Sequence, residues 1–293
     1  MAQIGIDGLC DRERISNASL RWLVVLYIPF GALLLLVRVA ALFAIGGAAR
    51  LLPSSQRRQL FPLFLTVYGF RRRWRGNGLF IAQPAMPMVI AYNHVSLYDA
   101  FILFELPHVA IISSDPQKNA SRVNAAVMGW VARSFSTDVR IITGGRDFVQ
   151  MLKAWRQSPA PPRLCIAPEG TVGNGKGLFA FEKGFFGIGA QVLPVTFKAA
   201  AALPISLHPV LAHHGLNYVW PLMLPWVTYE MEALPVTSIR SDETPQAFAE
   251  RVQLAMAQHL HIPATRVTRG DKATYRAALK ASRRRVSAPG LSG

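Results

Sequence analysis

The chain has 293 residues, of which 51% are hydrophobic, with two cysteines and a formal net charge of +16. This is enough apolar material for one large α/β domain and a smaller appended element, and two cysteines exclude a disulfide framework. The charge favours an anionic partner. Because the basic residues gather between residues 50 and 75 and between residues 266 and 285, anionic lipid headgroups fit better than a nucleic acid, and no nucleic-acid partner is expected.

The first 75 residues predict a membrane anchor. A polar leader over residues 1–21 precedes an apolar segment over residues 23–49, which is long enough for a bilayer crossing of about 20 residues. Pro29 and Arg38 interrupt this segment, so a kinked or re-entrant anchor fits as well as a simple span. The acidic leader is unlike a signal peptide, and the basic run that follows favours a cytoplasmic position for the rest of the chain. We expect membrane-anchoring apolar helices with a basic flank over residues 22–75.

From residue 76 to residue 265, apolar runs alternate with helical patterns. Strands are predicted at residues 86–91, 109–113, 139–143, 163–167, 192–197 and 227–231, and helices at residues 120–133, 147–156 and 245–260. This alternation is typical of an α/β domain. We predict a mixed sheet flanked by helices, then a basic, partly disordered tail over residues 266–293.

His94 and Asp99 follow the first predicted strand. Ser96, with Asp99 three residues later and an apolar run behind it, predicts a helix start with Ser96 as the N-cap. The turn between strand and helix can bring Asp99 to His94, which a spacing of five within a helix cannot. An aspartate on one ring nitrogen leaves the other to take a proton from an alcohol, as a general base does. The alternative is that Asp99 is only the acid of a capping box.

A turn of Pro168, Glu169 and Gly170 follows the strand predicted at residues 163–167. In open α/β sheets, ligands bind at the carboxyl ends of the strands. This turn and His94 are therefore expected at the same edge, and together they indicate acyl transfer.

Four ordered blocks resemble the glycerolipid acyltransferases, which act on glycerol 3-phosphate and lysophospholipids. The likeness covers roughly residues 22 to 275 and is greatest to the lysophosphatidate and lysophosphatidylcholine acyltransferase branch, whose extended Glu-Gly-Thr loop and Ile-Pro-Ala-Thr segment resemble residues 169–174 and 262–265. The blocks are Asn93-His-x-Ser-x-x-Asp99, Ala167-Pro-Glu-Gly-Thr171, Phe181-Glu-Lys-Gly-Phe-Phe186 and Val192-Leu-Pro-Val195.

The resemblance implies roles for the matching residues. His94 would be the catalytic base and Asp99 its partner, while Glu169 and Gly170 would help to hold the glycerol phosphate of the acceptor. Pro194 would shape the end of the pocket. The full substrate-binding set that we expect is Asn93, Ser96, Arg140, Glu169, Gly170, Thr171, Lys183 and Pro194.

The family's phosphate-binding arginine has no plain counterpart in this chain. Its block is reduced here to residues 138–141, and Arg140 is taken for it by its distance from the Glu-Gly turn, with Arg146 as the alternative. A second family arginine, after the Thr of the Glu-Gly-Thr block, is replaced by Val172. Lys176 or Lys183 would have to supply that contact.

The implied enzyme is an acyl-CoA-dependent glycerolipid O-acyltransferase that needs no metal and no cofactor. Its donor would be acyl-CoA or acyl carrier protein, and its acceptor a membrane lysophospholipid. The first choice of acceptor is 1-acyl-sn-glycerol 3-phosphate, which would give phosphatidate. Lysophosphatidylcholine or another lysolipid is the alternative. The localisation that follows is the membrane, with the active site facing the cytoplasm.

Two readings from other classes stay open. Residues 170–177 fit a nucleotide-binding phosphate loop except at Gly177, where the pattern requires Ser or Thr, so a nucleotide-dependent lipid kinase is one alternative. The other is a non-catalytic basic tether for membranes or nucleic acid. In that case His94 would be dispensable and the arginine clusters would not.

Overall fold

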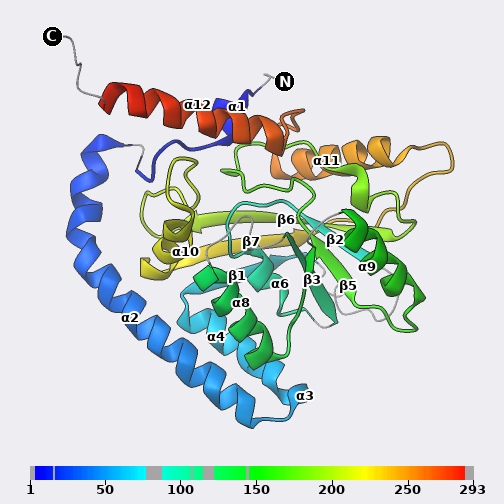
Figure 1. Cartoon of the computed structure of the whole chain (residues 1–293), viewed down its shortest axis with the longest axis horizontal. Helices are drawn as coiled ribbons and strands as arrows, with labels where there is room; N and C mark the ends of the chain where they lie inside the picture. Colours follow the sequence, from blue (N-terminus) through cyan, green and yellow to red (C-terminus); the bar gives the residue numbers. More distant parts are fainter. Residues whose placement is uncertain are drawn as a thin grey trace.

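The computed structural model describes residues 4–15, 17–76, 88–106, 108–114, 122–142 and 145–287. Within them lies a seven-stranded sheet with the strand order β1-β7-β6-β2-β5-β3-β4 (Figure 1). The strands are β1 (Phe70–Arg75), β2 (Met88–Tyr92), β3 (Val109–Ser114), β4 (Asp138–Ile142), β5 (Arg163–Ile166), β6 (Gln191–Ala201) and β7 (Val227–Ala233).

The sheet is mixed, as the sequence predicts. Strands β2 to β6 run parallel to one another, whereas β7 pairs with β6 in the antiparallel direction and with β1 in the parallel direction. The predicted strands are confirmed, except that residues 86, 87 and 143 lie outside the described residues. β1 was not predicted, because four of its six residues are arginines. The sheet therefore begins at Phe70, inside the segment that the sequence assigns to the anchor.

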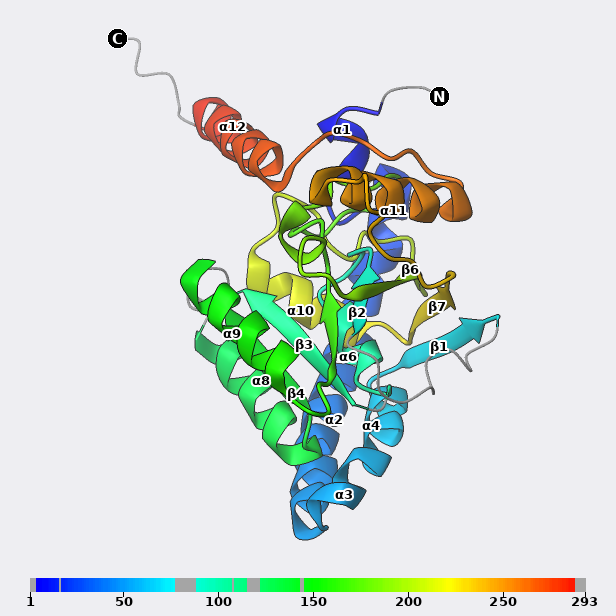
Figure 2. The ribbon, with the colours of Figure 1, turned by 90° about the vertical axis from the view of Figure 1, so that its right-hand side faces the viewer.

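Helices cover both faces of the sheet (Figures 1 and 2). Ile90 of β2 belongs to one hydrophobic cluster and its neighbours Val89 and Ala91 to the other, because successive side chains of a strand point to opposite faces. The first cluster is covered by α2 (Arg21–Leu51), α4 (Phe61–Val67), α6 (Asp99–Leu103), α8 (Arg122–Phe135) and α10 (His214–Met223); the second is covered by α9 (Gly145–Gln157) and α11 (Pro245–Leu260). The short α3 (Ser54–Arg57) joins α2 to α4.

The apolar N-terminal segment forms the long helix α2, which runs along the outside of the domain (Figure 1). Among the described residues, this helix, counted from Ala18 to Leu51, is the one that is long and apolar enough to cross a membrane. Its buried residues recur at helical spacing, at Val24, Gly31, Arg38, Leu42, Gly46 and Ala49. At Gly46 a β-carbon would stand 2.0 Å from the Trp130 ring of α8, so only glycine permits this approach.

Arg38 docks α2 instead of interrupting it. Its guanidinium is 3% exposed and donates to the carbonyl oxygens of Val67, Leu222, Leu224 and Pro225 at 2.5 to 3.0 Å. These carbonyls lie at the ends of α4 and α10, where the last backbone acceptors of a helix have no partner within it. A charge that is costly in lipid is thus placed inside the protein.

Some arginines of the cluster expected to face lipid form contacts within the fold instead. Arg72 forms a 3.0 Å ion pair with Glu105, Arg75 pairs with Glu230 at 2.9 Å, and the guanidinium of Arg71 lies 3.7 Å from the ring centre of Trp226. β1 therefore uses its charges mainly to join the sheet edge to neighbouring elements.

Both chain ends pack on the domain. Helix α1 (Ile6–Leu9), in the segment read as a polar leader, carries the fully buried Leu9, and α12 (Arg269–Ser287) occupies most of the segment read as a partly disordered tail. The two helices lie side by side in both views (Figures 1 and 2). The domain boundaries at residues 21, 75 and 265 remain predictions.

Candidate active site

At the end of β2, the side chain of Asn93 takes the place of the backbone in hydrogen bonding to β6. Its amide nitrogen donates to the Phe197 carbonyl at 2.9 Å, and its amide oxygen accepts from the Phe197 N–H at 2.7 Å. The last backbone pairing before it is Tyr92 with Val195. Because the side chain satisfies β6, the backbone can turn away from the sheet, and the next residue, His94, stands at the strand's carboxyl end.

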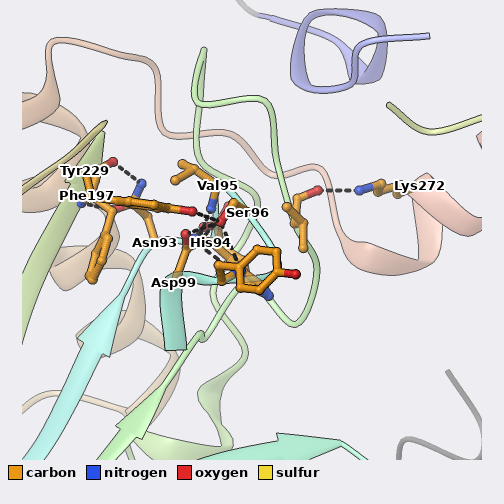
Figure 3. A network of polar contacts seen from close by, with 11 residues as sticks. Asn93, His94, Val95, Ser96, Asp99, Phe197, Tyr229 and Lys272 are labelled. Atoms are coloured by element: carbon orange, nitrogen blue, oxygen red, sulfur yellow. Dashed lines mark hydrogen bonds and ion pairs between the residues drawn. The ribbon is translucent and has the colours of Figure 1, made fainter. Parts of the chain in front are cut away.

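His94 and Asp99 meet in this turn (Figure 3). Nδ1 of His94 lies 3.0 Å from Oδ2 of Asp99, and the same oxygen accepts the N–H groups of Val95 at 2.6 Å and Ser96 at 2.9 Å. The other oxygen accepts the hydroxyl of Ser96 at 2.8 Å. Asp99 is fully buried. An ionised carboxylate only accepts, so Nδ1 carries the proton and Nε2 is left for exchange.

The prediction that Ser96 is the helix N-cap is wrong. Helix α6 begins at Asp99, its N-cap position is Tyr98, and that residue makes no side-chain cap. The Ser96 hydroxyl instead accepts the Tyr98 N–H at 3.0 Å in the turn before the helix. The two readings of Asp99 are compatible, since its carboxylate binds backbone N–H groups and the imidazole at once.

Tyr229 belongs to this network, although the sequence gives no sign of it. Its hydroxyl, at the buried centre of β7, lies 2.6 Å from Oγ of Ser96. The single Ser96 proton is committed to Asp99, so Tyr229 must be the donor. In the sequence, Tyr229 alternates with Val227 and Met231 and reads as an ordinary core residue.

Glu169 holds the His94 backbone from the turn that follows the neighbouring strand β5. One of its carboxylate oxygens accepts the N–H of His94 at 2.7 Å and the other accepts the N–H of Phe179 at 2.9 Å. The carbonyl of His94 accepts the N–H of Gly173 at 2.7 Å. Gly170, at φ +61°, reverses the chain so that Glu169 and Gly173 can both reach His94. The two motifs therefore meet at one edge.

Burial of Glu169 has an electrostatic cost. Its pKa is raised to about 8, chiefly by burial and also by the charge of Asp99, while the N–H groups of His94 and Phe179 and the charge of Lys272 lower it. The ionised form of Glu169 fits this site better, because each of its two oxygens accepts one N–H group. In the neutral acid, one of the two N–H groups would face a hydroxyl oxygen, which is a weaker acceptor.

A cavity of about 230 Å³ adjoins the site. It reaches the turn after His94 at Val95 and the Glu169 loop at Gly173 and Asn174, and Lys198 and His208 lie in its wall. The cavity therefore presents backbone polar groups and charged side chains close to the two motifs.

Arg140 is not brought to this edge. It lies on β4, separated from β2 by β5 and β3, and its guanidinium pairs with Asp138 at 3.1 Å. At about 4.8 Å between neighbouring strands, that is roughly 14 Å from β2. The alternative, Arg146, is exposed in the first turn of α9. The expectation that Arg140 contacts the Glu169 turn finds no support in its placement.

The remaining predicted residues lie nearer. Thr171 follows Gly170 in the Glu169 loop. Pro194, on β6, pairs with Ala91 of β2, the strand that precedes His94. Lys183 is exposed at the start of a short 3-10 helix (Lys183–Phe185), and Lys176 is occupied by Asp11 at 3.3 Å.

The segment at residues 170–177 does not have the architecture of a nucleotide phosphate loop. In such loops the lysine is followed directly by a helix whose N-terminus faces the phosphates. Here residues 171–177 form bends and turns, followed by an isolated bridge at Leu178. Within the described residues, moreover, no group of three His, Cys, Asp or Glu side chains could hold a metal ion.

Comparison with known proteins places this geometry in a family. Residues 77–198 match the family model described as Acyltransferase. The chain is 25% identical over 290 residues to the lipid droplet-regulating VLDL assembly factor AUP1 of Danio rerio, covering 97% of this chain and 64% of that protein. It is 26% identical over 187 residues to the lysophospholipid acyltransferase LPCAT4 of Xenopus tropicalis, covering 61% of this chain and 35% of that protein. The chain thus spans under two thirds of the length of these relatives.

A solved structure shares the fold. The 1-acyl-sn-glycerophosphate (LPA) acyltransferase PlsC of Thermotoga maritima aligns with a TM-score of 0.56 at 14% identity, covering 80% of this chain and 96% of that one. With the matching family model and the LPCAT4 likeness, this shared fold supports a glycerolipid acyltransferase family for the chain.

Proposed function

We propose that this protein transfers a fatty acyl group from a thioester to the free hydroxyl of a lysophospholipid, with 1-acyl-sn-glycerol 3-phosphate as the first acceptor and phosphatidate as the product. The observation that carries the proposal is the 3.0 Å contact between Nδ1 of His94 and the buried Asp99. This contact fixes the imidazole at the edge where Glu169 also stands.

In the proposed reaction, Nε2 of His94 takes the proton of the acceptor hydroxyl as its oxygen attacks the thioester carbonyl. The tetrahedral intermediate collapses by breaking the carbon–sulfur bond, and the imidazolium returns the proton to the departing thiolate. Asp99 stabilises the imidazolium in between. Such general-base catalysis contributes about 10²- to 10⁴-fold, and no covalent enzyme intermediate is needed because the thioester is already activated.

The cavity beside the Glu169 loop is the proposed position of the polar part of a substrate. Lys198 and His208 in its wall provide cationic or hydrogen-bonding contacts for a phosphate. These two residues take over, in this proposal, the role that Arg140 was expected to have.

The test is an assay of radiolabelled acyl transfer from oleoyl-CoA, and separately from oleoyl-acyl carrier protein, to a panel of lysolipids. We expect turnover with lysophosphatidate to exceed turnover with lysophosphatidylcholine. Preference for the zwitterionic acceptor would move the proposal to the alternative substrate. Absence of transfer to every acceptor from both donors would refute the proposed activity.

A second function is supported by one observation, the similarity to AUP1 across 97% of the chain. The name of that protein describes lipid droplet regulation and VLDL assembly. A chain with this role would use the fold to hold a lipid surface and would not depend on His94 for it.

We further propose that the outer face of α2 sits in the membrane, with the active site on the cytoplasmic side. Leu26, Phe30 and Leu33 are 62%, 70% and 61% exposed on this face. The opposite face docks on α10 and α8 along most of the helix, which favours a helix lying within one leaflet over one that leaves the domain to cross the bilayer.

We expect full-length protein to stay with membranes through a high-salt wash, because burial of apolar surface resists salt. Replacing Leu26, Phe30 and Leu33 together by Gln should make binding sensitive to salt, measured by vesicle sedimentation against ionic strength. Arg73→Gln, at an exposed position of β1, is the matched control and should keep salt-resistant binding. Release of wild-type protein by salt alone would contradict the placement of α2.

A further inference from the structure

Lys272 is a buried lysine in the C-terminal helix α12. Its side chain is only 8% exposed, and its ammonium group donates to the carbonyl oxygen of Val172 (Figure 3). Val172 belongs to the loop that Glu169 opens, so a residue about one hundred positions away in sequence holds the back of the candidate site.

The same ammonium group faces the environment of Glu169. It lies 5.7 Å from the ring centre of Phe179, and the backbone N–H of Phe179 is one of the two donors to Glu169. Burial lowers the pKa of Lys272, while Cys10 and Glu169 raise it and Arg276 on its own helix lowers it. A lysine is rarely buried unless it is paired, and the carboxylate it interacts with here is that of Glu169.

Other contacts keep α12 at this position. Arg269 forms a 2.8 Å ion pair with Glu182, beside Gly170, and the hydroxyl of Tyr275 donates to Asp7 of α1. The backbone of Leu9 accepts the N–H of Asn174 at 3.1 Å. The two ends of the chain thus enclose the Glu169 loop from the side away from His94.

We propose that Lys272 is a positioning residue of the acyl-transfer site, which fixes the Glu169 loop through the Val172 carbonyl and keeps the Glu169 carboxylate ionised. Lys272 does not reach the substrate. It acts through Glu169, which in turn fixes the backbone of His94. This inference rests on the proposed function, since it names a residue on which the same site depends.

The sign of the electrostatic effect is definite. The charged groups around Glu169 are Asp99 from α6, which raises its pKa, and Lys272 from α12, which lowers it. Removing the ammonium group therefore raises the pKa of Glu169. Less of the carboxylate is then ionised at a given pH, and the ionised form is the one that accepts both N–H groups.

The experiment measures kcat/KM for acyl transfer against pH in Lys272→Met. We expect the acidic limb to move up by about one pH unit, so that transfer falls about tenfold near neutral pH and recovers at high pH. Lys272→Arg keeps the charge and should keep the limb of the wild-type protein. Lys280→Met removes an exposed lysine from the same helix and should leave the profile unchanged.

Each outcome decides the question. Wild-type protein without transfer would refute the proposed function itself, whereas active wild-type protein with an unchanged limb in Lys272→Met would overturn only the role of Lys272. A loss of transfer that is equal at all pH values would overturn the electrostatic role of Lys272, because that pattern is expected from the contact with Val172 alone.

A second measurement applies if Lys272→Met folds poorly. If Lys272 stabilises the charge of Glu169, its loss should cost less stability when that charge is absent. We expect Lys272→Met to lower the Tm less in a Glu169→Gln background than in the wild-type protein. An equal loss in both backgrounds would show that the lysine does not balance Glu169, and the proposal would fall.

Discussion

His94→Ala should reduce acyl transfer by about 10²- to 10⁴-fold, the range that a general base contributes, while folding and membrane binding persist. The imidazole is the one group at this edge whose ring nitrogen is held by a buried carboxylate, at 3.0 Å from Asp99. Its backbone, not its side chain, makes the contacts with Glu169 and Gly173. Those contacts survive the substitution. Single-turnover assays with purified protein measure the effect on the chemical step.

His259 supplies a matched control for this variant. Its Nε2 lies 3.0 Å from a carboxylate oxygen of Glu232, so it too is an imidazole paired with an acid, but it is on α11 and outside the two motifs. His259→Ala should keep wild-type turnover. Substantial transfer by His94→Ala would remove the general-base assignment, and it would favour the non-catalytic role that the AUP1 likeness suggests.

Asp99→Asn should lower kcat by a factor of about 10² to 10⁴, because the neutral amide cannot stabilise an imidazolium. The fully buried carboxylate also accepts from two backbone N–H groups and the Ser96 hydroxyl. An amide would turn one oxygen into a donor facing donors, at a cost of about 1–3 kcal/mol in unfolding free energy. Thermal unfolding and kcat should be measured on the same preparation. A folded variant with a mild loss would support the capping role alone.

Tyr229→Phe tests the same hydrogen-bond network and should have a smaller effect. It removes only the hydroxyl that donates to Ser96, which is two hydrogen bonds away from Asp99 and three from the imidazole, so its effect on kcat should be about tenfold or less. Tyr98→Phe is the comparison, since Tyr98 has an equally buried ring whose hydroxyl donates to the Tyr218 carbonyl instead. An equal effect of both variants would show that the loss of any buried hydroxyl nearby has this effect, and that the Tyr229 hydroxyl does not specifically orient the dyad.

The parts of the fold that the sequence predicts are those in which one residue pattern has one interpretation. β2 and β5, which are buried on both faces and apolar except for Arg163, read as strands, and α11 begins at Pro245, after the N-cap Thr244, and ends at Leu260 as its pattern indicates. The meeting of His94 and Glu169 follows from the rule that parallel strands bring their carboxyl ends to one edge. Local pattern and general topology were sufficient there.

The features that the sequence did not predict have a common physical origin, since each depends on a partner distant in the chain. β1 is a strand because β7 pairs with it residue by residue, although its arginines indicate a charged surface. Lys272 reads as part of a basic tail until the burial of its ammonium group is known. Arg140 was chosen by spacing along the sequence, and spacing does not determine which strand becomes the edge of a sheet.

The four carbonyl partners of Arg38 have a consequence for the order of events during synthesis. One partner, Val67, follows 29 residues later, but the others belong to residues made 184 to 187 residues after Arg38. At about 5–20 residues per second, that interval is roughly 10–40 s. Throughout it, an apolar helix with an unsatisfied arginine at its middle has left the ribosome without its docking surface. The docking of α2 on the domain is thus among the last steps of folding.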